Sequence, residues 1–301
     1  MRVLGYEVIA TLGYGARSTI FAVRDQTGQV YALKRVVKQE ESDQRFLNQA
    51  IIEHEVAQQF SHVTLRRSYK LYRQRGLIRV KEIYVLKELV EGDTLEHYQP
   101  KDMIDLLQVC QQVALGLKAM HDAGYVHADM KPSNVLVAPG GKVKIIDYGQ
   151  SCPCGTVKQR IQGTPDYIAP EQVLRQAISP QTDVFCLGAT MYWLLTKQHV
   201  PTLLPKGKPG VNLRTEETCR PPDDINAEVP PALSSLIMHC VAREPSDRPG
   251  TMALVHDRLA LAIAQLKTKH SPRPIILNDS LPEPSMSDSS IDTMGSIDLD
   301  S

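Results

Sequence analysis

The stretch YVHADMKPSNVLV, residues 125–137, places a dense polar group among apolar residues. Within it, Asp129, Lys131 and Asn134 stand directly before a Val-Leu-Val run that is typical of a buried strand. A chain rarely sets a carboxylate, an ammonium and an amide against a core strand without a chemical use for them, because buried polar groups are costly. This stretch is therefore the predicted centre of a functional site.

The composition predicts a globular protein with a sizeable core. The chain has 301 residues, of which 42% are hydrophobic and 23% charged, enough for one large domain or two lobes. Its formal net charge is zero, so the field of the whole molecule gives no reason to expect a nucleic acid as partner. The longest apolar window, residues 186–195, is about half of a membrane span. We therefore expect a cytoplasmic protein without a transmembrane segment.

The cysteines do not form the dense pattern of a disulfide-stabilised secreted domain. Six of them are scattered along the chain, apart from the pair Cys152 and Cys154. No second Cys/His pair at zinc spacing accompanies this pair, so we expect reduced thiols and assign no metal to them. Metal binding or oxidant sensing by the pair is the weaker alternative.

Hydrophobic periodicity divides the chain into a sheet-rich part and a helical part. Residues 3–37 alternate apolar and polar and predict successive antiparallel strands, and residues 46–60 follow with helical spacing. A further strand is expected at residues 83–92. Beyond it, a helix is predicted over residues 102–124, with Gly124 as its stop. Apolar windows of the kind found in helices recur after it, at residues 183–195, 232–242 and 252–266.

This division favours an α+β fold with two lobes. The expected lobes are residues 1–91, a small antiparallel sheet with one main helix, and residues 92–267, which are mostly helical. Residues 268–301 are rich in Ser, Asp and Pro and are expected to form a disordered tail. The acidic, serine-rich end of that tail is a candidate docking segment.

Glycines and a lysine near the N-terminus suggest a place for a phosphate chain. Gly13 and Gly15 lie two residues apart between expected strands, where the lack of a Cβ lets the backbone approach phosphates closely. The sequence YALK then puts Lys34 on the next strand, within reach of the same phosphates. A lysine that faces the interior needs an anionic partner. Glu53 or Glu55 can supply it, but the two point about 200° apart around a helix, so only one faces Lys34.

Downstream of the opening stretch, Asp147 ends the strand-like sequence KVKIID. Phosphoryl transfer from ATP needs hard oxygen ligands for Mg²⁺, a cation on the phosphates and a carboxylate aimed at the acceptor hydroxyl. Asp147 and Asn134 can hold the metal ion, which would be Mg²⁺ or alternatively Mn²⁺. Lys34 can bind the phosphates and Asp129 the hydroxyl. The residue types and their order therefore indicate a phosphotransferase.

Together these motifs resemble those of the eukaryotic-type (Hanks-type) serine/threonine protein kinase family. The matching segments are GYGARSTI, YALK, HADMKPSN, DYG and APE, in that order, over about residues 6–260. The resemblance implies a bilobal protein-kinase-like fold and transfer of the γ-phosphoryl group of ATP to Ser or Thr of a protein substrate. Lys131 and Thr164, the latter in GTPDY, resemble the serine/threonine members rather than the tyrosine kinases.

The resemblance also implies roles for individual residues. Catalytic roles fall on Asp129, Lys131, Lys34, Glu53 and Thr164. The ATP site would comprise Leu12, Gly13, Gly15, Ser18, Ile20, Ala32, Lys34, Lys87, Glu88, Val90, Asn134, Leu136 and Asp147. Within it, adenine would lie between Ile20, Ala32 and Leu136 and bond to the backbone of Glu88 and Val90. Structural roles fall on Asp183 and on an ion pair between Glu171 and Arg248.

Two departures from the family pattern concern regulation. Ala128 stands where the catalytic loop commonly has an arginine that binds a phosphorylated activation segment. Cys152, five residues after Asp147, replaces what is often a second basic partner. The hypothesis is therefore that activity does not require phosphorylation of the activation segment.

Other departures concern the nucleotide site and the surface. Alignment of YVLKELVEG puts Lys87 at the gatekeeper position behind the adenine, and a register error of one residue would instead leave it solvated. Ala57, one turn after Glu53, is smaller than the hydrophobic residue usual there and could loosen the helix. The basic run at residues 65–81 is either a docking surface for a partner or anionic lipid, or a solvated strand face.

Two alternatives to a protein kinase stay open at this point. One is a pseudokinase or ATP-binding scaffold, for which Lys87 and Ala57 are the grounds. The other is a small-molecule phosphotransferase with a related core, which the segment GTPDYIAPEQ, residues 163–172, disfavours. For a protein substrate, Thr94 and Ser133 are uncharged where kinases that prefer basic peptides commonly carry acids, which disfavours an arginine-directed preference.

Overall fold

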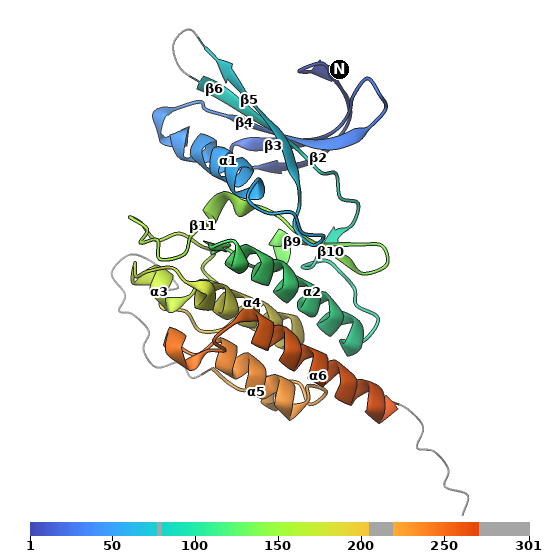
Figure 1. Ribbon diagram of the computed structural model, residues 1–301, viewed down its shortest axis with the longest axis vertical. Helices are drawn as coiled ribbons and strands as arrows, with labels where there is room; N and C mark the ends of the chain where they lie inside the picture. Colours follow the sequence, from blue (N-terminus) through green and yellow to red (C-terminus); the bar gives the residue numbers. More distant parts are fainter. Residues whose placement is uncertain (77–79, 205–218, 271–301) are drawn as a thin grey trace, which may run out of the picture.

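The computed structural model describes residues 1–76, 80–204 and 219–270. Its N-terminal part is an antiparallel sheet of six strands in the order β1-β2-β3-β4-β6-β5, with helix α1 (Gln44–Ala57) on one face (Figure 1). The strands are β1 (Arg2–Val3), β2 (Tyr6–Gly15), β3 (Ser18–Arg24), β4 (Val30–Val37), β5 (Ser68–Arg75) and β6 (Val80–Lys87). The predicted strands and main helix of this part are confirmed.

Strand alternation decides which side chains of the sheet face helix α1. Val36, Ile83 and Val85 pack with Leu47 and Ala50 of the helix, whereas the neighbouring residues of each strand face the opposite side. Successive side chains of a strand point to opposite faces. The same alternation carries two lysines, one from β4 and one from β6, to the helix side of the sheet.

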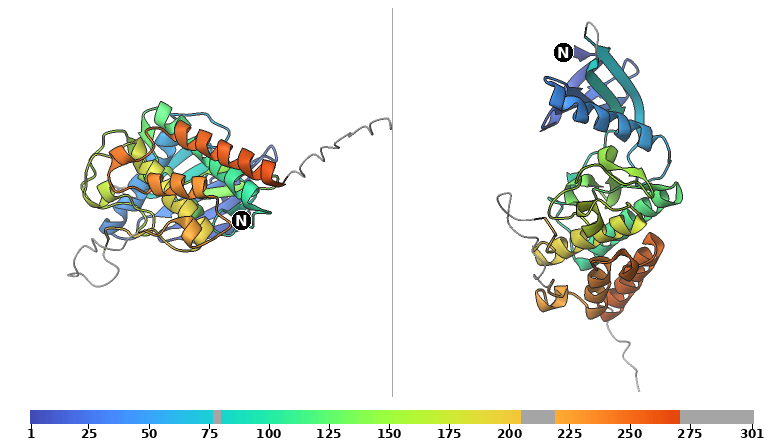
Figure 2. Two further views of the ribbon diagram at one scale, coloured as in Figure 1. Left: turned by 90° about the horizontal axis from the view of Figure 1, so that it is seen from below. Right: turned by 90° about the vertical axis from the view of Figure 1, so that its left-hand side faces the viewer.

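The C-terminal part is mostly helical and lies below the sheet in Figure 1. Its helices are α2 (Met103–Asp122), α3 (Pro170–Val173), α4 (Pro180–Thr196), α5 (Pro231–Cys240) and α6 (Met252–His270). The views in Figures 1 and 2 both place α2 and α6 side by side, and they share the largest apolar cluster of the described chain. The protein-kinase-like bilobal α+β fold is thus confirmed.

Short elements line the boundary between the two parts. They are the strands β7 (Asp93–Thr94), β8 (Tyr125–Val126), β9 (Val135–Ala138), β10 (Lys142–Ile145) and β11 (Cys152–Pro153), and the 3₁₀ turns η2 (Pro132–Asn134) and η3 (Tyr148–Gln150). Three further 3₁₀ turns precede helices, namely η1 (Glu41–Asp43) before α1, η4 (Pro222–Asp224) before α5 and η5 (Pro245–Asp247) before α6. The connection from β6 enters this layer through Gly92. A Cβ there would lie 2.3 Å from the carbonyl oxygen of Val137, so only glycine permits this close approach.

Helix α2 begins and ends where its sequence predicts. The Asp102 side chain caps it by accepting a hydrogen bond of 2.7 Å from the backbone N–H of Asp105. Gly124 follows the helix with a φ of +80°, a left-handed conformation that favours glycine. Helix α6, by contrast, runs to His270, three residues past the predicted end of the lobe at residue 267. The rest of the predicted tail, residues 271–301, lies outside the described residues.

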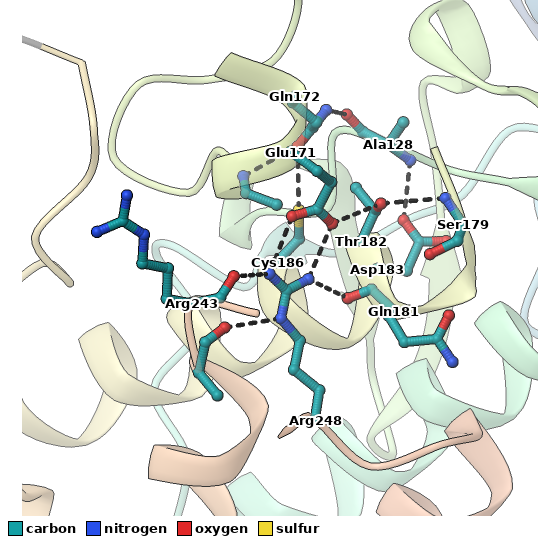
Figure 3. A network of polar contacts seen from close by, with 12 residues as sticks. Ala128, Glu171, Gln172, Ser179, Gln181, Thr182, Asp183, Cys186, Arg243 and Arg248 are labelled. Atoms are coloured by element: carbon teal, nitrogen blue, oxygen red, sulfur yellow. Dashed lines mark hydrogen bonds and ion pairs between the residues drawn. The ribbon is translucent and has the colours of Figure 1, made fainter. Parts of the chain in front are cut away.

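A buried ion pair joins the segment before α4 to the turn before α6 (Figure 3). Arg248 donates two parallel hydrogen bonds to Glu171, at 2.8 and 2.9 Å. It also donates to three backbone carbonyls, those of Gln181, Ala242 and Arg243. Every donor of the guanidinium group therefore has a nearby acceptor in a region from which solvent is excluded, as a buried charge requires.

None of the described helices is long and apolar enough to cross a membrane.

Removal of one partner from this pair should be strongly destabilising. We expect Glu171→Ala to lower the free energy of unfolding by about 3–5 kcal/mol, because it leaves Arg248 charged and buried without its anion. Asp122→Ala, which removes the partner of Lys118 from an exposed ion pair on α2, should cost only a few tenths of a kcal/mol. Urea unfolding curves measure both, and equal losses would contradict the structural role of the pair.

Candidate active site

The catalytic loop joins β8 to β9, and its polar side chains contact one another. Thr164 donates a hydrogen bond of 2.8 Å to Oδ1 of Asp129 and accepts one of 2.7 Å from Nζ of Lys131. That ammonium also lies 3.2 Å from Oδ2 of Asp129. The amide of Asn134 donates to the backbone carbonyl of Asp129 at 2.8 Å. These four predicted residues therefore form one cluster around the carboxylate.

Buried Asp183 of helix α4 holds the backbone of this loop in place. It accepts hydrogen bonds of 2.8 Å from the backbone N–H groups of His127 and Ala128, and a third from the ring of His121. Burial would raise the pKa of this carboxyl group, but the nearby His121 and His127 outweigh burial and lower it. The ionised carboxylate thus supports Ala128, whose φ of +60° is strained for a residue with a side chain.

Asp147 follows strand β10 and is also left-handed, with a φ of +64°. Its Oδ1 atom accepts a hydrogen bond of 3.3 Å from the backbone N–H of Gly149, and the side chain is exposed. The backbone N–H of Ile146 donates to the carbonyl of Asn134 at 2.9 Å, which fixes this segment beside the catalytic loop. Strained backbone of this kind concentrates at functional sites.

The side chains of Asp147 and Asn134 fit a divalent metal ion. Asn134 uses its N–H₂ group as a donor, while its Oδ1 atom accepts no hydrogen bond from any described residue. The second carboxylate oxygen of Asp147 is likewise without a donor among the described residues. Two hard oxygen atoms from adjacent segments are thus available, as Mg²⁺ requires.

Lys34 and Glu53 form the predicted ion pair between β4 and α1. Their Nζ and Oε2 atoms lie 2.8 Å apart, and the side chains are 19% and 5% exposed. Glu55, the alternative partner, points to solvent. Burial would lower the pKa of Lys34, but attraction by Glu53 and Asp147 outweighs it and raises the pKa. Lys34 therefore stays charged and faces the metal-binding side of the site.

Lys87 contacts the second oxygen of the same carboxylate. Its Nζ atom binds Oε1 of Glu53, and its side chain is only 6% exposed, so the alternative with a solvated Lys87 is wrong. The register explains the burial, because Ala32 pairs with Lys87 and Lys34 with Val85, on the face that α1 covers. Burial lowers the pKa of Lys87 to about 8, with further lowering by Lys34, although Glu53 acts in the opposite direction.

The residues expected to surround adenine lie on three neighbouring segments. Ile20 is on β3, Ala32 on β4 and Leu136 on β9. In the connection after β6, the N–H of Val90 has no acceptor among the described residues, and it can therefore donate to a base. Leu12, Gly13 and Gly15 lie at the end of β2, and Ser18 begins β3. A Cβ built on Gly13 would have no neighbouring atom within 4 Å, apart from those of the adjoining residues.

Two site residues were not recognised from the sequence. Arg66, in the basic run at residues 65–81, is half-buried, and its Nε donates at 2.9 Å to the carbonyl of Glu88, an expected adenine contact. The prediction of a solvated strand face is therefore wrong for Arg66, although Lys70, Arg73 and Arg75 of the run are exposed. Arg66 stands before β5 in the turn that follows α1, where strand periodicity gives no signal.

The second is Arg17, in the glycine-rich turn between β2 and β3. Its guanidinium group donates to buried Asp43 at 2.8 Å and to Gln39 and Glu40. Asp43 in turn accepts from two backbone N–H groups of the same connection. The turn that would cover the phosphates is thus tied to the start of α1. An Arg and an Asp that are 26 residues apart in the sequence give no local signal.

The region where the family binds an activating phosphate is apolar in this chain. Ala128 and Cys152 are buried in one cluster with Val126 and Ile178. Burial raises the pKa of the Cys152 thiol, which disfavours the thiolate that metal or oxidants require. Ser151 is buried too, and its hydroxyl donates to the carbonyl of His127. The two substitutions noted in the sequence therefore pack against each other instead of leaving an empty anion site.

The ion pair between Arg17 and Asp43 should limit the mobility of the glycine-rich turn. We expect Arg17→Ala to increase amide hydrogen exchange over residues 13–18, because the turn loses its contacts with the segment before α1. Arg24→Ala on β3, where the exposed arginine lies 3.8 Å from Glu7, is the control and should leave that exchange unchanged. Equal exchange in Arg17→Ala and the unmodified chain would contradict the link.

The comparisons with known proteins agree with this geometry. The family model for the protein kinase domain matches residues 6–260. Serine/threonine-protein kinase PknD of Chlamydia pneumoniae is 24% identical over 278 residues, which cover 81% of this chain and 29% of that protein. Serine/threonine-protein kinase A of Synechocystis is 25% identical, over 87% of this chain and 54% of that protein. Serine/threonine-protein kinase PknA of Mycobacterium tuberculosis is 27% identical, over 80% and 56%.

The chain thus spans about a third to about half of the length of these curated relatives. The family match covers both lobes and includes every segment that positions the site, from the glycine-rich turn to Arg248. The chain therefore belongs to the protein kinase domain family.

Proposed function

We propose that the chain is an ATP-dependent serine/threonine protein kinase that transfers the γ-phosphoryl group to hydroxyl groups of protein substrates. The observation that carries this proposal is the contact set of Asp129, which binds Thr164 and Lys131 beside an intact pair of Lys34 and Glu53. The relatives named as serine/threonine kinases support the same acceptor class.

In the proposed mechanism, Asp129 orients the acceptor hydroxyl and takes its proton late in the transfer, which contributes roughly 10² to 10⁴ in rate. Lys131, held between Asp129 and Thr164, offsets negative charge on the group in transit. Lys34 does the same for the phosphates that stay on the nucleotide. Its pair with Glu53 fixes the ammonium before substrate binds, so less reorganisation is needed in the transition state.

Asn134 and Asp147 would hold the divalent metal ion, which would be Mg²⁺ or alternatively Mn²⁺. When bound, such an ion supplies positive charge to the phosphate oxygens. The adenine would lie between Ile20, Ala32 and Leu136, with the backbone of Glu88 and Val90 as its polar partners. Lys87 borders the same site from behind.

The structure weakens the grounds for a pseudokinase. Lys87 does not displace Lys34 from Glu53, because each lysine binds its own carboxylate oxygen. Ala57 is buried, and the ring of Phe60 nearby contacts the ring of Tyr148 at a centroid distance of 5.8 Å, so aromatic packing supports the end of α1. A small-molecule phosphotransferase has no observation in its favour here, since Thr164 of the expected peptide platform contacts the catalytic Asp129.

Several finer expectations belong to the same proposal. The partners are ATP and a protein with a Ser or Thr acceptor, and we expect no nucleic acid. The uncharged Thr94 and Ser133 disfavour substrates selected by arginine. The lobes are assigned to residues 1–91 and 92–267, with residues 268–301 as a tail whose acidic end docks a partner. The neutral net charge and the free cysteines support a cytoplasmic location.

Two isosteric substitutions test the proposed activity. We expect Asp129→Asn to lower kcat about 10²- to 10⁴-fold, because the amide cannot take the hydroxyl proton. Asp147→Asn should lower it at least as far by weakening the metal site, while asparagine tolerates the left-handed backbone. Transfer of labelled phosphate from ATP to a mixed peptide library measures both. Asp257→Asn, at an exposed position of α6, is the matched control, and an activity equal in all four chains would contradict the proposal.

If the activity does not depend on phosphorylation of the activation segment, the double variant Ser151→Ala/Thr156→Ala should keep most of the activity. Ala128 and Cys152 themselves supply no cation to a phosphate on the activation segment, because both lie in an apolar cluster. The same transfer assay measures the double variant, with a thermal melt to detect loss of the Ser151 hydrogen bond. A loss of activity without a change in melting temperature would contradict the hypothesis.

A further inference from the structure

A single carboxylate on helix α1 binds two ammonium groups from the sheet. Lys34 of β4 contacts Oε2 of Glu53, and Lys87 of β6 contacts Oε1. The helix is thus connected to two adjacent strands through one side chain. The exposed fractions of the three side chains, 19% for Lys34, 6% for Lys87 and 5% for Glu53, show that water contributes little to their solvation.

Lys87 depends on Glu53 for its charge balance. The charged and titratable groups that face it are Glu53 and His54 of α1, Lys34 of β4, and Arg66 of the turn after α1. Lys34 and Arg66 repel it, and Glu53 is the one carboxylate among the described residues that attracts it. Outward movement of α1 would therefore leave the buried Lys87 without its anion and would remove the ion-pair partner of Lys34. If residue 87 were apolar, the same movement would separate only Lys34 from its partner.

The structure also shows why such a contact matters in this chain. Phosphate on an activation segment cannot order the site through Ala128 or Cys152, since both are packed in an apolar cluster. Contacts that exist without phosphate can order α1 instead. The contact between Lys87 and Glu53 is of this kind, because it lies wholly within the N-terminal lobe.

We propose that Lys87 is a positioning residue that holds Glu53, and with it helix α1, in the orientation that pairs with Lys34. This inference deepens the proposed kinase function and rests on it for its effect on rate. The contact acts through Glu53 and touches none of the reacting atoms. It takes the place of the phosphate-dependent ordering that Ala128 removes.

Lys87→Met tests the proposal by removing the charge while keeping the length of the side chain. We expect kcat to fall by on the order of tenfold, since the paired orientation of α1 becomes less populated. The KM for ATP should change little, because Lys34 still binds the phosphates. Amide exchange should become faster in residues 44–57 and stay unchanged in the rest of the sheet. Lys81→Met, at an exposed position of the same strand, is the matched control and should behave as the unmodified chain.

The pH dependence separates positioning from packing. The pKa of Lys87 is lowered by burial from 10.5 to about 8, so its ammonium is present below that pH and is lost as the pH rises through it. We expect an alkaline fall in kcat near pH 8 that is missing in Lys87→Met. Deprotonation of Lys87 would not by itself cause unfolding, because this side chain binds more protons in the unfolded chain between about pH 8 and 10.5, and its own contribution to stability therefore rises with pH there.

Three results would overturn the proposal. They are an unchanged kcat and α1 exchange in Lys87→Met, an alkaline fall that persists in that variant, and a loss of exchange protection that spreads over the whole sheet. The last result would make Lys87 a general packing residue. The exchange measurement needs no turnover, so it tests the contact even if the unmodified chain transfers no phosphate, a result that would contradict only the proposed kinase function.

Discussion

One buried carboxylate, that of Glu53, connects helix α1 to two neighbouring strands of the sheet. Its two oxygen atoms each bind a different lysine, and little of Glu53 or Lys87 is exposed to water that could replace these contacts. The position of Lys34, and hence of the charge meant for the nucleotide phosphates, depends on this arrangement. Because Glu53 and Lys87 are buried, the ion-paired orientation of the helix is favoured over any orientation that separates their charges.

A second set of buried charges, in the C-terminal lobe, holds the catalytic loop in place. Asp183 accepts hydrogen bonds from the backbone N–H groups of His127 and of the strained Ala128, and the ion pair of Glu171 and Arg248 anchors the segment that carries Thr164 (Figure 3). Gln172 links the two, since its amide donates to the carbonyl of Ala128 at 2.8 Å. The site thus lies between two networks of charged side chains that pair within the protein, and neither network includes a phosphorylated residue.

Much of this was predictable from the sequence. Alternation and helical spacing gave the sheet, α1 and α2, because these patterns report directly which side chains face a core. The clustering of the candidate site residues was predictable because the proposed chemistry requires particular side chains in a short stretch, as at Asp129 and Asn134. The family resemblance predicted Glu53 rather than Glu55, whereas spacing alone left both open, and the burial of Lys87 needed the structure because a register error of one residue would reverse it. The contacts of Arg17 and Arg66 could not be predicted from the sequence, because their partners are distant along the chain.

The central claim is that buried charge, and not phosphate, orders this site. The most direct measurement is the initial rate of phosphoryl transfer by protein treated with a phosphatase, which is then removed, compared with untreated protein. The arrangement of Glu53, Lys34 and Lys87 predicts equal initial rates without a lag. A large loss of rate, recovered only as the chain phosphorylates itself, would contradict it.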